Sequence, residues 1–401
     1  MTEKYYTYYD SIFDILDGDD KVRANMFYST ILHKQRAYKS IFKEDYIGNY
    51  ISCSDLRDIL GRHKYKKILE MLINTGVITL LDKKNSYGQQ LYFIHEVKEI
   101  NGVKKVTTSR RVVKSIHNNK KRKYENLSKE AKQLLKNLQK TKINISKKEY
   151  NKITETRFQE YVSSCNTIGG HLTFEEYSQT MEYVWELIQR FNESETDDEL
   201  LDFISEDNFG HRIHSLISLV PSILRKFIEI DGEETTEVDL KASQPTILAK
   251  VLKNSIGEND FTTAVTEKED IYIDIQEKLH LPNRSSAKTA MFEMMFGSTI
   301  GNGQRIFDTF FPQAGRVVRQ IKSKKNIYNP SDKIYSNLAF LMQRTERKIF
   351  GEIWNELAKQ NIVYLTVHDS IICKKSELSK VITIMEQVLS KHIDKFQIVT
   401  K

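Results

Sequence analysis

The chain has 401 residues, and its 61 Lys and Arg against 54 Asp and Glu give a net charge of +7. This length exceeds that of a typical single domain, so we expect two or three domains with cores of their own. The hydrophobic fraction of 39% and the charged fraction of 29% are typical of a globular protein, and no window approaches the roughly 18 apolar residues of a membrane span. The composition therefore argues against a small peptide and against a membrane-spanning protein.

Cysteine use and the start of the chain both indicate a reducing interior. Cys53, Cys165 and Cys373 lie far apart and form no CxxC or Cys/His cluster, which argues against a disulfide framework or a structural zinc site. The first residues are acidic and aromatic, unlike a secretory leader. We expect a cytoplasmic location, in a bacterial or phage-infected cell, and no membrane partner.

Positive charge is concentrated in one segment. Residues 101–150 hold sixteen Lys and Arg against three Glu, whereas residues 191–210 hold eight acidic residues and no basic one. A concentrated basic surface attracts polyanions, because each neutralised phosphate releases counterions. We predict nucleic-acid contact here, with a solvated basic helix or linker as the alternative. The candidate contacts are Lys120, Lys121, Arg122 and Lys123.

The first hundred residues have the order helix, helix, hairpin. Short helices are predicted at residues 54–60 and 63–72, and β runs at residues 77–81 and 90–94 flank a turn at residues 82–88 with two lysines at its tip. This order looks like a winged helix, a common DNA-binding module. A plain protein-interaction domain has the same order and stays an alternative.

Two further helices are predicted in the middle of the chain. Residues 127–150 predict a basic amphipathic helix with Ala131, Leu134, Leu135 and Leu138 on its apolar face. Thr173 and Glu176 form a capping box at the start of the second helix, and residues 192–198 predict a loop and a domain boundary. We interpret the apolar stripe of the second helix as core: Phe174, Tyr177, Met181, Val184, Trp185, Ile188 and Phe191.

Two aspartates are predicted at strand ends in the C-terminal half. One β-strand ends around Asp239, and a helix follows near Pro245, a residue that suits a first helical turn. Residues 362–367 form a β-branched run, followed by a tight turn containing Asp369 and a returning strand at residues 371–373. An aspartate at a strand end is usually structural, so neither residue is informative alone.

Cationic and aromatic side chains recur every four residues between these aspartates. Arg284, Lys288, Phe292 and Phe296 drift only about 40° per step along one helix face. A triphosphate can lie against the two cations while a nucleobase stacks near the two aromatic rings. As a bare pattern, the same spacing also suits an ordinary amphipathic helix.

In this order, the three segments resemble motifs A, B and C of the right-handed single-subunit polymerases, which include the family A DNA polymerases and the phage-type RNA polymerases. Motif A surrounds Asp239, motif B is the R-x3-K-x3-F-x3-F-G pattern that ends at Gly297, and motif C is His368-Asp369-Ser370. The resemblance covers about residues 205–395 of the chain.

Two flanking segments add to the resemblance. Residues 210–214, which contain Arg212, are similar to a glycine-arginine segment that precedes motif A in the RNA polymerases. Residues 341–345 resemble the glutamine-bearing helix of the DNA polymerases, with Gln343 as the glutamine, and they are expected to open a helix.

The resemblance implies a fold and a metal site. It implies an α+β right hand with an antiparallel palm sheet, helical fingers at about residues 250–335 and thumb-like helices within residues 125–195. It also implies two Mg²⁺ ions, with Mn²⁺ as a substitute, held by Asp239 and Asp369 and by the backbone carbonyl of Leu240. These are the hard oxygen ligands that magnesium prefers.

The same resemblance implies how the nucleotide is bound. Arg284 and Lys288 would grip the triphosphate, Lys288 would protonate the leaving pyrophosphate, and Phe292 and Phe296 would line the nucleotide site.

Three more candidates each have a structural alternative. Arg212 would hold a template or primer phosphate, unless its role is purely structural. His368 would face the primer terminus, unless it is a satisfied turn residue. Gln343 would bond the minor-groove edge of the nascent base pair, unless it acts as a cap.

The choice of sugar depends on departures from the family pattern. Gln244 stands where family A DNA polymerases have a glutamate that crowds a ribose 2′-hydroxyl and where the RNA polymerases have a small residue. Phe296 replaces the usual tyrosine, and Ser370 ends motif C as in the RNA polymerases. We favour deoxynucleotides, because a bulky side chain at position 244 acts as a steric gate.

The sequence therefore predicts three domains: a winged-helix-like module in residues 1–100, a basic connector with thumb-like helices in residues 101–200, and a palm and fingers core in residues 201–401. We expect a DNA polymerase without proofreading that extends a 3′-hydroxyl on a nucleic-acid template with nucleoside triphosphates. Its setting would be the replication of a mobile genetic element, alongside other replication proteins. An RNA polymerase or primase and a non-catalytic replication initiator stay open as alternatives.

Overall fold

The structure is a computed structural model, and its contacts divide the chain into two compact units. The first unit comprises residues 1–126 and 151–186, and the second comprises residues 127–150 and 187–401. The division separates parts of the expected connector at residues 101–200, and the three-domain organisation stays a prediction. The described residues are 6–8, 16, 20–21, 23–24, 27–28, 49–51, 56–57, 60, 64–84, 90–94, 103–105, 120–164, 174–324 and 334–401.

The first unit contains a helix packed beside a three-stranded antiparallel sheet. Helix α3 (Tyr65–Asn74) packs against β3 (Ile78–Lys84), and the sheet has the order β2-β4-β3, with β2 at Asn49–Ile51 and β4 at Gln90–Ile94. A separate pair joins β1 (Tyr6–Tyr8) to β5 (Val103–Lys105). Ten buried apolar side chains of this unit form a core: Leu16, Ala24, Phe27, Tyr28, Leu56, Leu60, Ile68, Leu72, Val77 and Ile78.

The helix predicted at residues 63–72 and the hairpin are therefore confirmed, with one change at the turn. The helix predicted at residues 54–60 lies mostly outside the described residues. Residues 82–84 belong to β3, so only residues 85–88 of the predicted turn remain, and these lie outside the described residues. The likeness to a winged helix stays a prediction.

The predicted helix at residues 127–150 is wrong in its length. Helix α5 (Lys129–Leu138) ends early, and β6 (Thr141–Ile143) and the start of α6 (Lys147–Ser164) follow it. The β-branched Thr141 and Ile143 are buried while Lys142 between them is exposed, and the strand pairs with β9 (Ile228–Ile230). The apolar face of α5 is confirmed, since Ala131, Leu134, Leu135 and Leu138 are all buried.

The apolar stripe of α7 (Phe174–Glu193) is confirmed as core at four of its seven residues, whereas Tyr177 and Trp185 are half-buried. Met181, Val184, Ile188 and Phe191 are buried, but the Phe174 side chain is 46% exposed at the helix start. Its ring lies 5.0 Å from the ring of Phe158, between centroids.

An antiparallel sheet carries both aspartate segments in the second unit. Strand β10 (Glu233–Leu240) has β12 (Ser370–Lys374) on one side and, at its C-terminal end, β13 (Ile398–Thr400) on the other. The strand order is β11-β12-β10-β9-β6, with β11 at Tyr364–Val367. The predicted strands and the turn between β11 and β12 are confirmed.

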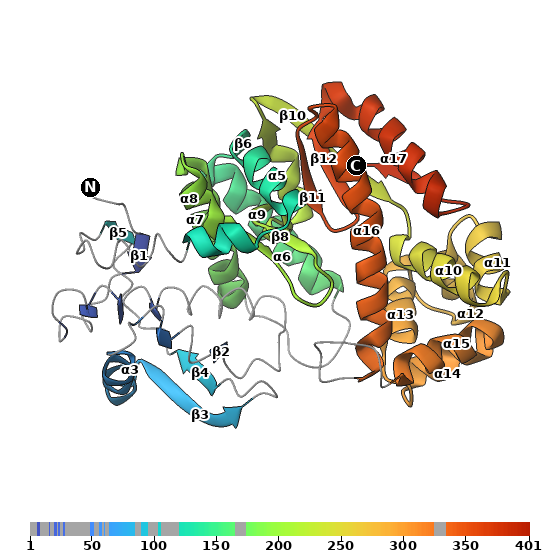
Figure 1. Ribbon diagram of the computed structural model, residues 1–401, viewed down its shortest axis with the longest axis horizontal. Coiled ribbons are helices and arrows are strands. Elements are labelled where there is room, and N and C mark those ends of the chain that lie inside the picture. The colour runs from blue at the N-terminus through green and yellow to red at the C-terminus, as the bar shows by residue number, and fades with distance from the viewer. Residues whose placement is uncertain are drawn as a thin grey trace. The chain divides into compact units, whose positions relative to one another are not determined.

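A long helix, α16 (Asn337–Lys359), connects this sheet with a group of shorter helices, as Figure 1 shows. It begins before residue 341, so residues 341–345 lie inside the helix and do not open it. The group shares one apolar core. Its members are α10 (Ser243–Ile256), α11 (Asp260–Glu267), α12 (Ile271–Lys278), α13 (Arg284–Phe296), α14 (Asn302–Phe310) and α15 (Pro312–Ser323).

Shorter elements complete the second unit, and α17 (Leu378–His392) packs along α16 and the sheet. The short elements are α8 (Asp197–Leu200), η2 (Leu201–Phe203), β7 (Ile204–Glu206), β8 (Ile213–Ser215), α9 (Leu216–Leu219), η3 (Ser222–Phe227), η4 (Ile334–Ser336) and η5 (Lys375–Glu377). The protein is thus a mixed α+β protein, mostly helical, with antiparallel sheets. In the described ranges, each helix is too short or too polar to span a bilayer.

Candidate active site

Asp239 and Asp369 meet at one end of the antiparallel sheet. Asp239 is the penultimate residue of β10 and pairs in register with Ser370, the first residue of β12, and Asp369 directly precedes Ser370. The backbone N–H of Leu240 donates to the carbonyl of Asp369 at 3.4 Å. Two residues far apart in sequence are therefore neighbours because the two strands pair.

Left-handed backbone conformations occur next to both aspartates. His368 has φ 57° in the turn before Asp369, and Ala242 has φ 51° as the N-cap of α10. Non-glycine residues rarely take this conformation, and such strain is common at functional sites. At Ala242 the chain turns from β10 directly into α10, which buries Ser243 and Gln244 at the start of the helix.

The environment of Asp369 disfavours its charged form. Burial raises the pKa of Asp369, the nearby charge of Asp239 raises it further, and the Ser243 hydroxyl opposes the shift. Lys401 lies against the other carboxylate, with its Nζ 2.7 Å from Asp239 and 3.0 Å from Glu237. Partial burial disfavours the charge of Lys401, but the hydrogen bonds to these two carboxylates raise its pKa. The site thus attracts a cation.

The donor atoms at this end of the sheet suit a hard divalent cation. Asp239 and Asp369 supply carboxylate oxygens, and Leu240 adds a main-chain carbonyl next to them in sequence. No group of three or more His, Cys, Asp or Glu side chains is gathered to hold a metal within the described residues. Magnesium is often held by one or two carboxylates together with substrate phosphates, so a pair is sufficient for such a site.

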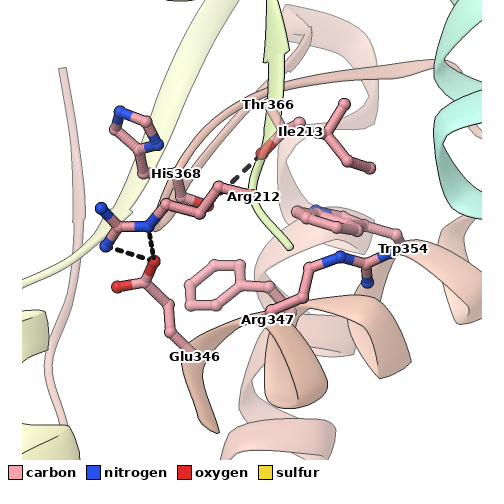
Figure 2. A pocket seen from close by; sticks show the side chains of 8 residues that line it. Arg212, Ile213, Glu346, Arg347, Trp354, Thr366 and His368 are labelled. Atoms are coloured by element: carbon pink, nitrogen blue, oxygen red, sulfur yellow. Dashed lines mark hydrogen bonds and ion pairs between the residues drawn. The ribbon is translucent and has the colours of Figure 1, made fainter. Parts of the chain in front are cut away.

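Arg212 and Gln244 converge on a buried glutamate, Glu346 of α16 (Figure 2 shows the arginine and the glutamate). The guanidinium of Arg212 donates to Glu346 Oε1 from Nε at 3.0 Å and from Nη2 at 2.8 Å. The amide Nε2 of Gln244 donates to the other oxygen, Oε2. Burial raises the pKa of Glu346 to about 7, Arg212 works against the shift, and Asp369 adds to it.

His368 lies half-buried near Arg212, with the ring of His214 against it at 5.7 Å between centroids. Burial, followed by the charges of Arg212 and His214, lowers the pKa of His368 to about 4, so it is neutral at pH 7. Its Nδ1 is buried without a hydrogen-bond partner among the described residues. The turn histidine is therefore not internally satisfied, which leaves its expected contact with a primer terminus open.

A small pocket borders Arg212, Glu346 and His368 (Figure 2). Its volume of about 10 Å³ holds about one water molecule. Trp354, which also lines it, has a buried Nε1 without a partner among the described residues. The pocket is too small for a nucleotide.

Gln343 packs against the loop that presents Arg212. A Cβ atom at Gly210 would lie 2.7 Å from the Cβ of Gln343, so the loop approaches α16 more closely than any side chain at this position permits. Asp207 closes the loop by accepting from the backbone N–H groups of Gly210 at 2.6 Å and Arg212 at 3.2 Å. Gln343 is thus in contact with the Arg212 loop and does not cap the start of α16.

Helix α13 presents the predicted series of cations and aromatic rings. Asn283 caps the helix by accepting from the N–H of Ser286 at 2.9 Å. Lys288 is exposed and lies 5.9 Å from the ring of Phe292, which is 5.7 Å from the ring of Phe296. In the described part of the chain Lys288 has no ion pair, so its charge is available to a ligand. Phe296 is half-buried and packs on the core of this helical group.

Arg284, in contrast, is already paired. Its Nε donates to Asp270 at 2.9 Å, and its guanidinium lies 4.9 Å from the ring centre of Tyr272. Lys241, the residue after Leu240, is 3.8 Å from the same Asp270 carboxylate. Burial raises the pKa of Tyr272, and the charges of Asp369 and Asp239 also raise it. The start of α13 is therefore linked to the aspartate pair through Asp270 and Tyr272.

The basic run at residues 120–123 belongs to the first unit. Residues 120–126 are helical, with Lys121 and Arg122 exposed and Lys120 and Lys123 half-buried. Lys121 forms a 4.0 Å ion pair with Glu125. Nucleic-acid contact by this run stays a prediction.

Sequence reasoning missed Glu346, Asp270 and Lys401. A signal for Glu346 exists, because it takes a position in an otherwise apolar stripe of α16 between Met342 and Ile349, both of which are buried. Asp270 and Lys401 have no comparable local signal, since they meet their partners only through the fold.

Comparison with known proteins adds no assignment. The sequence matches no protein-family model, and the search of curated proteins finds no significant relative.

Proposed function

We propose that this protein is a template-directed nucleotidyltransferase, most simply a DNA polymerase that extends a 3′-hydroxyl and has no proofreading activity. The observation that carries the proposal is the register of β10 and β12, which makes Asp239 and Asp369 neighbours at one end of the sheet. Two-metal nucleotidyl transfer requires ligands that hold two divalent ions close together, and carboxylates at neighbouring strand ends can supply them.

In this proposal the sheet of the second unit acts as a palm and helices α10–α15 act as fingers. The thumb-like role of residues 125–195 and the DNA-binding role of the N-terminal module remain parts of the proposal. Support comes from the position of α13, whose start is connected to the aspartates through Arg284, Asp270 and Lys241.

The reaction joins the primer oxygen to the α-phosphorus of the nucleotide. The P–O bond to this phosphorus forms, the bond to pyrophosphate breaks, and the hydroxyl proton leaves to solvent. Asp239 and Asp369, with the Leu240 carbonyl, would hold magnesium, which lowers the pKa of the attacking hydroxyl and neutralises the charge that develops on the phosphates. The Lys288 ammonium would bind the triphosphate and donate a proton to the departing pyrophosphate.

The first test is primer extension by the full-length protein on DNA and RNA templates, with deoxynucleotides or ribonucleotides and Mg²⁺ or Mn²⁺. Asp239→Asn and Asp369→Asn are each expected to slow extension by roughly 10³-fold, because each removes a proposed metal ligand. Asp394→Asn is the matched control, because Asp394 is an exposed carboxylate paired with Lys253 outside the site. Extension that persists in both active-site variants contradicts the mechanism.

Other outcomes identify the alternatives. Chain synthesis from ribonucleotides without a primer would indicate an RNA polymerase or primase. Failure to extend any primed template with either metal would favour the alternative that the protein is a non-catalytic replication initiator.

A further inference from the structure

We infer that the small pocket bordered by β11, α16 and the Arg212 loop is a binding site for one ordered water molecule. The water accepts a hydrogen bond from the indole N–H of Trp354 and donates to the hydroxyl of Thr366 and to the carbonyl of His368. It thereby joins α16 to the turn that carries Asp369. The inference goes beyond the proposed function and does not depend on it, because it concerns the support of a turn and no step of the reaction.

The indole of Trp354 supplies the donor. Trp354 is 3% exposed, and its Nε1 has no hydrogen-bond partner among the described residues. A buried N–H group without a partner is rare in native proteins, because it has lost its bond to solvent and gained none. Trp354 lines the pocket, and the guanidinium of Arg347 lies 4.9 Å from its ring centre. An acceptor held in the pocket would therefore satisfy the indole.

Thr366 and His368 supply the acceptors, and both border the pocket (Figure 2). Thr366 is 2% exposed, and its hydroxyl lies 3.3 Å from the carbonyl of Ser370 and 3.4 Å from that of His368. Both distances are long for a hydroxyl donor, and one proton cannot serve both carbonyls. A water that donates to the hydroxyl oxygen and to the His368 carbonyl leaves the Thr366 proton to Ser370, so each polar group gains a partner.

The size and the charges of the pocket favour water over an ion. Its volume of about 10 Å³ admits about one water molecule. The guanidinium groups of Arg212 and Arg347 disfavour a cation, and the carboxylate of Glu346 disfavours an anion. Ile213 and Phe350, which also line the pocket, are apolar and bond no ligand. A small neutral molecule that both accepts and donates hydrogen bonds fits all of these groups.

The water stabilises a strained turn. His368 has φ 57° and directly precedes Asp369. A residue other than glycine keeps this conformation only where the surrounding structure holds it. The His368 carbonyl belongs to the peptide group that leads into Asp369, so a bond from the water fixes the orientation of that peptide group.

The first experiment detects the water by NMR of the full-length protein through the indole proton of Trp354. The chain has two tryptophans, so ¹⁵N labelling of tryptophan gives two indole signals, which Trp354→Phe assigns. In the rotating frame, cross-relaxation from water should have the sign of a direct contact, which is opposite to that of chemical exchange. Thr366→Val should weaken this signal at least threefold, because it removes an acceptor of the same shape. Thr383→Val changes an exposed threonine of α17 and should leave the signal unchanged.

A double-mutant cycle in urea denaturation tests the bridge by its energetics. Thr366→Val should raise the equilibrium constant for unfolding by roughly tenfold in the wild-type protein. In the Trp354→Phe background its effect should be at least threefold smaller, because the bridge is already broken there. Equal effects in both backgrounds contradict the bridge. If Trp354→Phe does not fold, Trp185→Phe assigns the indole signals instead, and the NMR comparison decides.

The outcomes separate this inference from the proposed function. Absence of a direct water contact at the resolved Trp354 signal overturns the inference, as does a bromide ion found in the pocket by anomalous diffraction from crystals soaked in bromide. Either result leaves primer extension as a separate question. Conversely, a water contact in a protein that extends no primer supports the inference and rejects the proposed polymerase activity.

Discussion

The ammonium nitrogen of Lys401 lies 2.7 Å from a carboxylate oxygen of Asp239, one of the two residues proposed to bind metal. Strand β13 holds the lysine there, since Thr400 pairs in register with Val238 on β10. A side chain of the protein thus supplies positive charge at the position where the proposed reaction requires a metal ion.

Replacing Lys401 is therefore expected to favour metal binding. In Lys401→Met the carboxylates keep their mutual repulsion without a compensating cation, so the Mg²⁺ concentration that gives half of the maximal thermal stabilisation should fall. The pair is half-exposed and contributes about 1 kcal/mol at most, so the shift should be up to roughly fivefold. Lys391→Met, at an exposed position of α17, should leave this Mg²⁺ concentration unchanged. If Lys401→Met also leaves it unchanged, the Lys401 ammonium does not compete with Mg²⁺ for the carboxylates.

Asp369→Asn should stabilise the fold and slow the proposed reaction. Burial and the charge of Asp239 both disfavour the Asp369 carboxylate, so a neutral side chain of the same shape is expected to raise the melting temperature in EDTA by about 2–4 °C. The same change should slow single-turnover primer extension by roughly 10³-fold, because a metal ligand is lost. A lower melting temperature than wild type in EDTA would show that the site is not strained by like charges.

The two cations of α13 should differ in their effects. Lys288→Ala removes an exposed charge that has no ion pair among the described residues and also removes the proposed general acid. The KM for the nucleotide should therefore rise by about tenfold and kcat should fall by at least about 100-fold, with no change in melting temperature. Arg284→Ala also removes the bond to Asp270 and the contact with Tyr272, and should lower the melting temperature as well. Steady-state kinetics and calorimetry on both variants check this contrast.

The buried Lys322 should make the free energy of unfolding depend on pH in the alkaline range. It is buried on α15, where its ammonium donates to the carbonyls of Met294 at 3.2 Å and Gly297 at 3.0 Å and to Gln304 at 2.8 Å. Burial lowers its pKa from 10.5 to about 8, so between these pH values the folded state binds fewer protons than the unfolded state. The free energy of unfolding should therefore rise with pH across this window, by about 3 kcal/mol in all.

Urea denaturation at several pH values from 8 to 10.5 measures the slope of the free energy of unfolding against pH. Lys322→Met should flatten it, whereas Lys324→Met, at the exposed end of the same segment, should not. Equal slopes in wild type and Lys322→Met would mean that Lys322 titrates alike in both states.

Gly210→Ala should destabilise the loop that presents Arg212. Its added methyl group would lie 2.7 Å from the Cβ of Gln343, and overpacking of this kind costs about 1–3 kcal/mol. Combining it with Gln343→Ala should recover part of the loss, because the amide of Gln343 also obstructs the methyl group. Urea denaturation of the single and double variants tests both statements, and full stability of Gly210→Ala would contradict the close packing.

Local patterns were sufficient to predict the elements that bear the site. A β-branched run predicted the strand that ends before Asp369, and a strand was also predicted to end around Asp239. The four-residue spacing predicted α13 with Arg284 and Lys288 on one face. These elements are determined by residues close together in the chain, so they can be predicted from a single sequence.

Features that depend on distant partners could not be predicted. The helix at residues 127–150 is interrupted because residues 141–143 find a partner in β9, and nothing in the helical periodicity of that segment indicates this pairing. Glu346 is stabilised by Arg212 and Gln244, which lie on other elements of the fold. Phe174 continues an apolar stripe but is exposed, because a helix terminus is covered only where another element reaches it.

The position of β10 between β12 and β13 also determines when this sheet can form during synthesis. Both partner strands are encoded more than a hundred residues after Asp239, whereas helices α10–α15 contact one another over short stretches of sequence. Short-range contacts form early and long-range strand pairing forms late, so a growing chain is expected to fold the helix with Arg284 and Lys288 before it joins the two aspartates. A translation product interrupted before residue 398 leaves one side of β10 unpaired at Asp239, and an open strand edge of this kind invites association with other chains.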